Sequence, residues 1–171
     1  AIPIATGLSW ANKLLNKQRL VVVFFGDGAT EEGAFHESLD FASLHKLPIL
    51  FVCENNQFSV YTHLNERQFK GRQITKLAEA HGIKSKKING NDVENIFKSS
   101  NQIINQIKKH KEPYLLELET YRFIGHCGPN NDDHLNYRSQ QELNKWKNID
   151  PITIYRKNLI MNKIVNETKI L

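Results

Sequence analysis

Short apolar runs rich in β-branched or aromatic residues alternate along this chain with longer segments of helical period. The strong runs are Leu20 to Phe25, Ile49 to Cys53 and Tyr114 to Glu119, and a shorter strand is expected near Lys84 to Ile88. The first run is apolar throughout, which is typical of a strand covered on both faces in a parallel sheet. This alternation predicts an α/β fold, with a mainly parallel sheet and helices on both of its faces.

Helices are expected before, between and after these strands. At the start of the chain, the residues that recur at helical spacing are Ile4, Leu8, Ala11 and Leu15. The later helices are expected over Glu31 to Lys46, Ile74 to His81, Asp92 to about His110, and after Ser139 and Pro151. In the long helix that Asp92 caps, the residues expected to point inward are Val93, Ile96, Phe97, Ile103, Ile104 and Ile107. Residues 121–136 are rich in Gly, Asn and Asp and predict a long loop.

Composition places the chain among soluble globular domains. Of its 171 residues, 40% are hydrophobic and 24% are charged, and the mean hydropathy is −0.49. No apolar run approaches the roughly 20 residues that span a bilayer, so no membrane association is expected. The two cysteines, Cys53 and Cys127, predict no disulfide framework and suit a reducing compartment, and the cytoplasm is the expected localisation. Because the chain opens on Ala1 without an initiating Met, a piece truncated at both ends is expected.

The net charge of +5 raises the question of a nucleic-acid partner. Residues 1–60 carry 4 Lys and Arg against 6 Asp and Glu, whereas residues 67–111 carry 11 basic against 3 acidic residues. These cations are spread over several predicted elements with few aromatics among them, which favours a solvated or subunit-facing surface. Nucleic-acid binding by residues 67–111 stays open as an alternative.

Two polar turns follow the first two strong strands. Gly26-Asp27-Gly28 ends the first strand, and Glu54-Asn55-Asn56-Gln57-Phe58 ends the second. Carboxyl ends of neighbouring parallel strands meet at one edge of the sheet, where a glycine-rich turn can offer backbone N–H groups to a phosphate. A divalent cation bridging a diphosphate could take one carboxylate, one amide oxygen and one carbonyl oxygen from these turns. On this chemistry alone, a phosphate and metal site and an ordinary Asp-Gly turn both stay open.

The longer sequence around these turns resembles a known protein family. The segment GDGATEEGAFHESLDFASLHKLPILFVCENNQFSVYT, with YRFIGH at 121–126, YRS at 137–139 and DPI at 150–152, resembles the alpha subunit of the thiamine diphosphate-dependent decarboxylating component of 2-oxo acid dehydrogenase complexes. The resemblance covers nearly the whole chain. It implies the thiamine diphosphate-binding fold, with residues 1–171 forming a single domain that binds diphosphate and Mg²⁺.

The resemblance also implies which residues hold the cofactor. Asp27 and Asn56 would give side-chain oxygens to Mg²⁺, and Phe58, where the family often has Tyr, would give its backbone carbonyl. Gly28 and Ala29 would contact the diphosphate.

The loop after the third strong strand supplies the remaining candidates. By resemblance, Arg122 would reach the diphosphate, and His126 would be the catalytic loop histidine near the thiazolium, orienting the acceptor or exchanging protons. Regulated members of the family have a phosphorylatable serine where this chain has Cys127, so switching at that position is not expected. The acidic pair Asp132 and Asp133 is expected to form a solvated turn.

The activity implied is oxidative decarboxylation of a 2-oxo acid with acyl transfer to a lipoyl group. The chain would be the alpha half of the site, completed by a beta subunit in a heterotetramer and serving a lipoyl-bearing acyltransferase. Pyruvate, branched-chain 2-oxo acids and acetoin all stay open as substrates, and the fragment alone is expected to be inactive. The alternative from another class is a non-catalytic phosphate- or nucleotide-binding α/β module, although no GxGxxG fingerprint is present.

Overall fold

The computed structural model describes residues 1–128 and 130–169. Its strands are β1 (Val21–Gly26), β2 (Ile49–Asn55), β5 (Lys84–Asn89) and β6 (Tyr114–Glu119), with a small hairpin of β3 (Phe58–Ser59) and β4 (Thr62–His63). Its helices are α1 (Ile2–Leu14), α2 (Gly33–Leu44), α3 (Leu64–Arg67), α4 (Ile74–Ala80), α5 (Val93–His110), α6 (Gln140–Lys147) and α7 (Pro151–Met161). Short 3-10 turns are η1 (Asp27–Glu31), η2 (Asp133–Leu135) and η3 (Glu167–Lys169).

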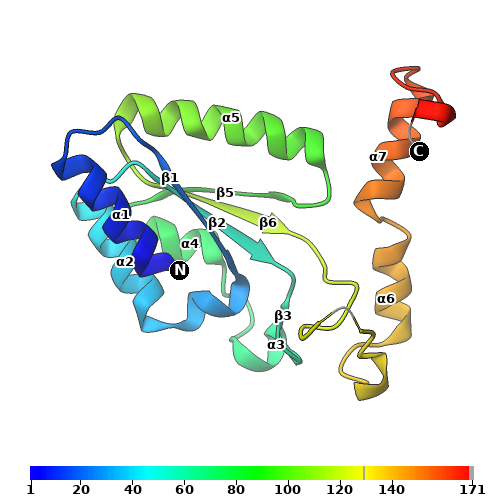
Figure 1. The fold of residues 1–171 in the computed structure, drawn as a ribbon. Helices are drawn as coiled ribbons and strands as arrows, with labels where there is room; N and C mark the ends of the chain where they lie inside the picture. Colours follow the sequence, from blue (N-terminus) through cyan, green and yellow to red (C-terminus); the bar gives the residue numbers. More distant parts are fainter. Residues whose placement is uncertain (129, 170–171) are drawn as a thin grey trace.

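A four-stranded parallel sheet in the order β1-β2-β6-β5 forms the centre of the molecule (Figure 1). Helices α1, α2 and α4 cover one face, where the core includes Phe35, Leu39 and Phe51. Helix α5 covers the other face, where Ile103 and Ile107 pack on residues of β2, β5 and β6. The predicted α/β fold, with a mainly parallel sheet and helices on both faces, is confirmed.

The edge strand β1 differs from its prediction. Val21, Val23 and Phe25 are buried under α1 and α2, but Val22 and Phe24 are 41% and 60% exposed on the opposite face. Helix α5 packs over the other three strands of that face and leaves β1 uncovered. The expectation that this strand is covered on both faces is therefore wrong, because an apolar run cannot show whether a covering element is present.

Helix α1 presents a different face from the one that its apolar stripe predicts, and α5 differs at two of its six predicted inward positions. In α1 the buried positions are Ile2, Ala5, Thr6, Ser9 and Asn12, whereas the stripe residues Ile4 and Leu8 are exposed. Small side chains on this face let α1 lie close to α2 and β1. In α5, Val93 and Phe97 are exposed because the stripe that meets the sheet runs through Ser99, Ile103 and Ile107.

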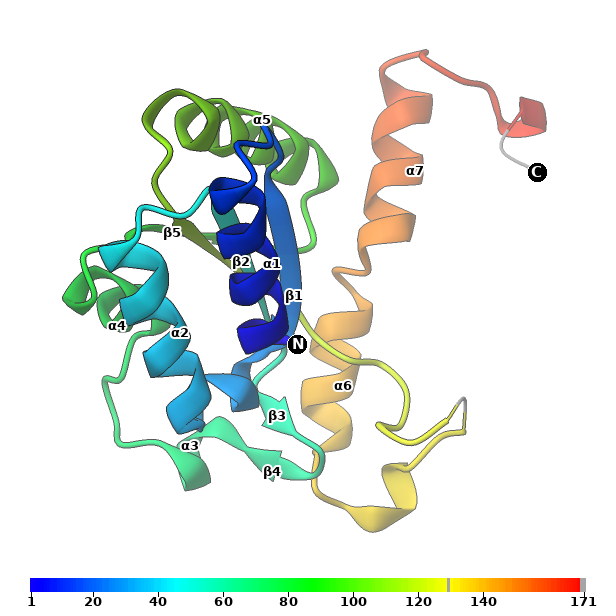
Figure 2. The same cartoon turned by 60° about the vertical axis from the view of Figure 1, so that its left-hand side comes forward.

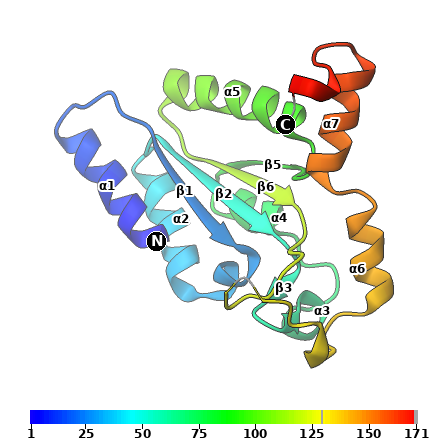
Figure 3. The ribbon, with the colours of Figure 1, turned by 45° about the vertical axis from the view of Figure 1, so that its right-hand side comes forward.

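The last part of the chain lies outside the central sheet and the helices that cover its two faces. Helices α6 and α7 lie beyond the carboxyl ends of the strands (Figures 1 and 3). A small cluster of Phe58, Tyr121 and Leu143, with Trp146 stacked on Tyr121, ties α6 to the β3–β4 hairpin. Helix α7 buries none of its residues. Within the described part of the chain, no helix combines the length and apolar character needed to cross a bilayer.

Candidate cofactor site

The two polar turns meet at the carboxyl edge of the sheet. Gly26 of β1 is paired in register with Glu54 of β2, so η1 and the segment after β2 leave the sheet side by side. The β3–β4 hairpin that follows β2 returns to lie against η1 (Figure 2). A Cβ added to Gly28 would stand 2.7 Å from Ser59 Oγ, so the turn and the hairpin are in direct contact. The convergence expected from the sequence is confirmed.

Asp27 is the buried acid of this edge. Its side chain is fully buried, and its Oδ2 accepts a hydrogen bond of 2.6 Å from Arg67 Nη2. Its Oδ1 is also buried and makes no hydrogen bond within the described chain. The backbone of η1 is held by Thr30, whose Oγ1 donates to the carbonyl of Asp27 at 2.6 Å. A buried carboxylate with one oxygen unused is costly unless a ligand or ion completes it.

The turn after β2 is shaped by its two asparagines. Asn55 Oδ1 accepts from Gln57 N at 3.1 Å, and Asn56 Oδ1 accepts from Phe58 N at 3.0 Å. The amide of Asn55 is in turn fixed by the buried Glu117, to whose Oε1 it donates at 2.9 Å. These bonds fold the backbone back into β3. The second residue of β3, Ser59, lies against Gly28, so Phe58 immediately precedes the residue that contacts the turn.

Two arginines that the sequence analysis assigned to a basic surface turn inward to η1. Arg67 of α3 pairs with both Asp27 and Glu31, and its Nε donates to the carbonyl of Thr62 at 3.1 Å. Arg72 donates to the carbonyl of Thr30 at 2.7 Å. Burial lowers the pKa of Arg72, and the nearby charge of Arg67 adds to this effect. The one signal in the sequence is indirect. Residues 26–33 contain three acidic side chains and no basic one, so cationic partners for this turn must come from elsewhere in the chain.

The loop candidates Arg122 and His126 lie together. Arg122 Nη1 is 3.2 Å from His126 Nδ1, and its Nη2 donates to the carbonyl of Val60 at 2.7 Å and to the Tyr137 hydroxyl at 3.1 Å. The bond to Val60 joins this loop to the tip of the β3–β4 hairpin. His126 is exposed. The predicted site residues therefore lie on three adjoining segments, namely η1, the hairpin region and the loop.

The acidic pair in this loop is not the solvated turn that was expected. Asp132 is 8% exposed and Arg138 6%, and Arg138 Nη2 donates to Asp132 Oδ1 at 2.8 Å. The Tyr137 hydroxyl donates to Asp132 Oδ2 at 2.7 Å. Burial alone would raise the pKa of Asp132, but the Tyr137 bond and the charges of Arg138 and Arg122 hold it below its usual value. Arg138 also donates to the carbonyl of Arg122, so this pair supports the loop that carries Arg122.

Comparison with known proteins agrees with the motif. The dehydrogenase E1 component family matches residues 1–170. The chain belongs to this family. The alpha subunit of the pyruvate dehydrogenase E1 component from Rickettsia felis is 34% identical over 166 residues, which is 97% of this chain and 50% of the relative. The mitochondrial 2-oxoisovalerate dehydrogenase subunit alpha from Mus musculus is 37% identical over 160 residues, 93% of this chain and 36% of the relative.

The fold of this E1 family chain is also found among solved structures. A protein from Mycobacterium smegmatis, assigned to the thiamin diphosphate-dependent enzymes, matches with a TM-score of 0.50 and 21% identity, over 71% of this chain and 22% of that chain. That likeness concerns the fold. The E1 family chain spans about half the length of the Rickettsia relative.

The residues of this E1 family site fit a divalent cation and a diphosphate. Among residues 1–128 and 130–169, no group of three or more His, Cys, Asp or Glu side chains is placed to hold a metal. A cation here would thus need amide and carbonyl oxygens beside a single carboxylate, which is the donor set of Asp27, Asn56 and Phe58. The unused, buried Oδ1 of Asp27 supplies the anionic ligand of such a set. A cavity of about 600 Å³ lies at the same edge of the sheet, lined in part by Gln57, Arg72 and Glu117, and none of the predicted site residues lines it.

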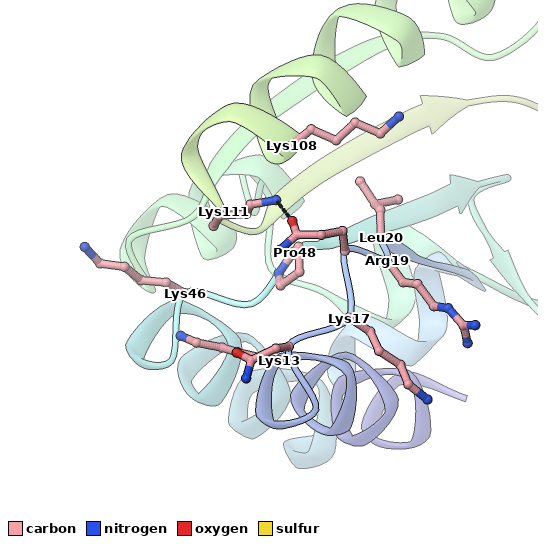
Figure 4. A pocket seen from close by; sticks show the side chains of 10 residues that line it. Lys13, Lys17, Arg19, Leu20, Lys46, Pro48, Lys108 and Lys111 are labelled. Carbon is pink, nitrogen blue, oxygen red and sulfur yellow. Dashed lines mark hydrogen bonds between the residues drawn. The ribbon is translucent and has the colours of Figure 1, made fainter.

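A second pocket of the E1 family chain lies at the opposite, amino edge of the sheet (Figure 4). It measures about 170 Å³, and its cationic lining residues are Lys13, Lys17, Arg19, Lys46, Lys108 and Lys111. The figure shows Arg19, Lys46 and Lys108 pointing away from one another, whereas Lys111 points across the pocket, where its Nζ donates to Gln18 Oε1 at 2.8 Å. The carboxyl ends of α1, α2 and α5 meet there, and cations at helix carboxyl ends offset the exposed carbonyls. None of the predicted site residues lines this pocket.

Proposed function

We propose that this chain is the alpha-subunit half of a thiamine diphosphate- and Mg²⁺-dependent enzyme that decarboxylates a 2-oxo acid and passes the acyl group to a lipoyl acceptor. The observation that carries the proposal is the buried Asp27 carboxylate, with one oxygen unused, on a glycine-flanked turn beside Asn56 and Phe58. The printed names of the relatives, which refer to pyruvate and to 2-oxoisovalerate, support the reaction class. Both 2-oxo acids fit the proposal, whereas acetoin, which has no carboxylate to lose, would fit only a related cleavage of a carbon–carbon bond.

Each group would act through binding and orientation. Asp27, Asn56 and the carbonyl of Phe58 would hold Mg²⁺, and the backbone of Gly28 and Ala29 would contact the diphosphate. Arg122 would neutralise phosphate charge, and His126, held beside it at 3.2 Å, would orient the acceptor or exchange a proton through its imidazole. The bound cofactor supplies the nucleophilic carbon and the electron sink that decarboxylation requires.

A beta subunit is part of the proposal because apolar side chains stay uncovered on two sides of the chain. Phe24 of β1 is 60% exposed, and Ile152 and Met161 of α7 are 79% and 78% exposed. Large uncovered apolar surfaces commonly mark subunit interfaces. A heterotetramer with beta subunits, serving a lipoyl-bearing acyltransferase, is the assembly that this surface and the family together favour.

The nucleic-acid alternative gains no support from the basic stretch. Arg67 is taken up by Asp27 and Glu31, Lys76 by Glu79, and Lys87 by Glu117 and Glu119. A surface that binds phosphate backbones needs unpaired cations gathered on one face, and of this stretch Lys108 and Lys111 line the basic pocket at the amino edge, where Lys111 is bound to Gln18. No observation favours the non-catalytic nucleotide-binding module either.

The test is cofactor binding by the full-length protein with its beta subunit, measured by calorimetry with thiamine diphosphate and Mg²⁺. Asp27→Asn keeps the shape of the side chain but removes its charge, and we expect it to weaken binding by about a hundredfold, corresponding to two steps of roughly 1.4 kcal/mol. Asp40→Asn is the matched control, because Asp40 is an exposed acid that lies against His81. Undiminished cofactor affinity in a folded Asp27→Asn variant would contradict the proposal.

A further inference from the structure

A cation of the chain itself lies at the proposed metal site. Arg67 Nη2 stands 2.6 Å from Asp27 Oδ2, with side-chain exposures of 11% and 0%. The same guanidinium pairs through Nη1 with Glu31, whose side chain is 29% exposed. One arginine therefore serves two carboxylates, one of them fully buried.

A buried carboxylate needs a positive partner in every state of the folded protein. Leaving Asp27 alone would cost the full desolvation of its charge, which pairing with Arg67 offsets. A divalent ion on the same carboxylate would place two cations together in a poorly solvated site, where like charges repel strongly. Arg67 and a divalent ion therefore compete for Asp27.

We propose that Arg67 is the resident counter-cation of Asp27, and that a divalent ion displaces it when the cofactor site is loaded. The inference rests on the proposed function, since it takes Asp27 as a metal ligand. Oδ1 of Asp27 is buried and makes no hydrogen bond within the described chain, so the carboxylate keeps one acceptor for an ion while Arg67 is still bound to Oδ2. Glu31 remains as a partner for the released guanidinium.

The segment that carries Arg67 is suited to such an exchange. Helix α3 is four residues long and buries none of them, and it follows a hairpin of two-residue strands. Short elements with few buried contacts open at low free-energy cost. Asp27 itself follows β1 directly and stays fixed by the sheet, so the exchange moves the arginine and not the acid.

The exchange makes two linked predictions for Arg67→Met, which removes the cation but keeps an extended side chain. Without metal, the melting temperature falls because Asp27 loses its partner. With metal, affinity rises because the ion no longer displaces a resident charge, and coupling of this kind is reciprocal.

The experiment uses the full-length enzyme freed of metal, with Mn²⁺ as the probe and free Mn²⁺ measured by electron paramagnetic resonance, with and without thiamine diphosphate. We expect Arg67→Met to bind Mn²⁺ about tenfold more tightly than the parent and to gain more in melting temperature when Mn²⁺ is added. Arg67→Lys should fall between them. Arg19→Met is the matched control, because Arg19 is exposed and has no ion pair in the described part of the chain.

Mn²⁺ affinity in Arg67→Met equal to or weaker than that of the parent would overturn the exchange. If Arg67→Met is unfolded without metal, refolding on addition of Mn²⁺ supports it, and failure to refold with Mn²⁺ counts against it. The Asp27→Asn variant distinguishes failure of the proposed exchange from failure of the proposed function. If Asp27→Asn abolishes Mn²⁺ binding while Arg67→Met does not tighten it, only the exchange fails. If Asp27→Asn leaves Mn²⁺ binding intact, the proposed function fails as well.

Discussion

Two buried aspartate–arginine pairs hold two different parts of this molecule. Asp27 and Arg67 lie where β1 ends, and Asp132 and Arg138 lie in the loop after β6. In the loop pair both carboxylate oxygens are used, one by Arg138 and the other by the Tyr137 hydroxyl. In the sheet-edge pair Oδ1 of Asp27 is unused.

The difference separates a structural pair from one that can accept a ligand. A buried carboxylate whose acceptors are all satisfied has nothing to gain from a further cation, and its role is to fix its surroundings. A buried carboxylate with an unused oxygen still carries part of its desolvation cost, and an incoming ion can recover it. Ion pairing alone would have classed the two sites together, whereas counting the unused acceptors distinguishes them.

The largest effect is expected at the loop pair. Arg138→Met leaves the buried Asp132 charge without its main partner, which costs about 3–5 kcal/mol. Because the loop and α6 lie outside the sheet layers, we expect the loss of amide-exchange protection to be confined to residues 120–147, with β1 and β2 unchanged. Added Mn²⁺ should not restore Arg138→Met, in contrast to Arg67→Met.

An exposed ion pair provides the control for this prediction. Arg156 and Glu167 lie 2.9 Å apart with side-chain exposures of 44% and 70%, so Arg156→Met should change stability by no more than about 1 kcal/mol. Recovery of Arg138→Met by Mn²⁺ to the same extent as Arg67→Met would erase the distinction between the two pairs.

A smaller effect is expected from crowding the turn at the sheet edge. A Cβ on Gly28 would lie 2.7 Å from Ser59 Oγ and 3.0 Å from Ser59 Cβ, so Gly28→Ala must push the hairpin away. We expect a loss of about 1–3 kcal/mol in unfolding free energy, which is typical of overpacking. Cofactor affinity should fall with it, because the turn and hairpin carry the proposed metal ligands. Chemical denaturation and calorimetry measure the two quantities.

A second substitution that removes the contact between residue 28 and Ser59 tests whether this contact causes the loss. Ser59→Gly removes the atoms that the new methyl group would meet, so the double variant should regain most of the stability lost in Gly28→Ala. Gly33→Ala is the matched control, since no atom lies within 4 Å of a Cβ there, and alanine in a helix is favoured over glycine by roughly 1 kcal/mol. Equal losses from Gly28→Ala with and without Ser59→Gly would show that the hairpin is not what limits this turn.

The sequence predicted best what the backbone pattern alone decides. The predicted run Tyr114 to Glu119 matches β6 at both ends, and the predicted run Ile49 to Cys53 matches the start of β2, which extends to Asn55. The meeting of the turns that carry Asp27 and Asn56 was predictable because the topology of a parallel sheet fixes the edge at which its turns emerge. These inferences need no knowledge of side-chain contacts.

What the sequence could not predict depends on contacts between distant segments. Arg67 bonds to Asp27, 40 residues earlier in the chain, from a four-residue helix that is too short to show a helical period of apolar residues. Asp132 reads as a surface acid in a polar loop, and only the folding of that loop onto Arg138 and Tyr137 buries it. The exposed Val22 and Phe24 show the converse, since an apolar strand face does not reveal what covers it.

The last and smallest effect compares the same two regions through their thiols. Cys53 lies buried in β2 and Cys127 is exposed in the loop. Burial, followed by the nearby charges of Glu117 and Asp27, raises the pKa of Cys53 well above its ordinary value. The folded chain therefore keeps this thiol protonated, and its contribution to stability is present below about pH 9 and is lost as the pH rises further.

With Ellman's reagent at pH 8 we expect one thiol to react at once and the second only when the chain unfolds. Cys127→Ser should remove the fast reaction, whereas Cys53→Ala should leave it unchanged. Raising the pH from 8 to 9 should leave Cys53 unreactive, because burial holds its pKa well above the ordinary value. A fast reaction of Cys53 in the folded Cys127→Ser variant would mean that β2 opens readily, and the sheet edge could then no longer be treated as the rigid partner of the loop.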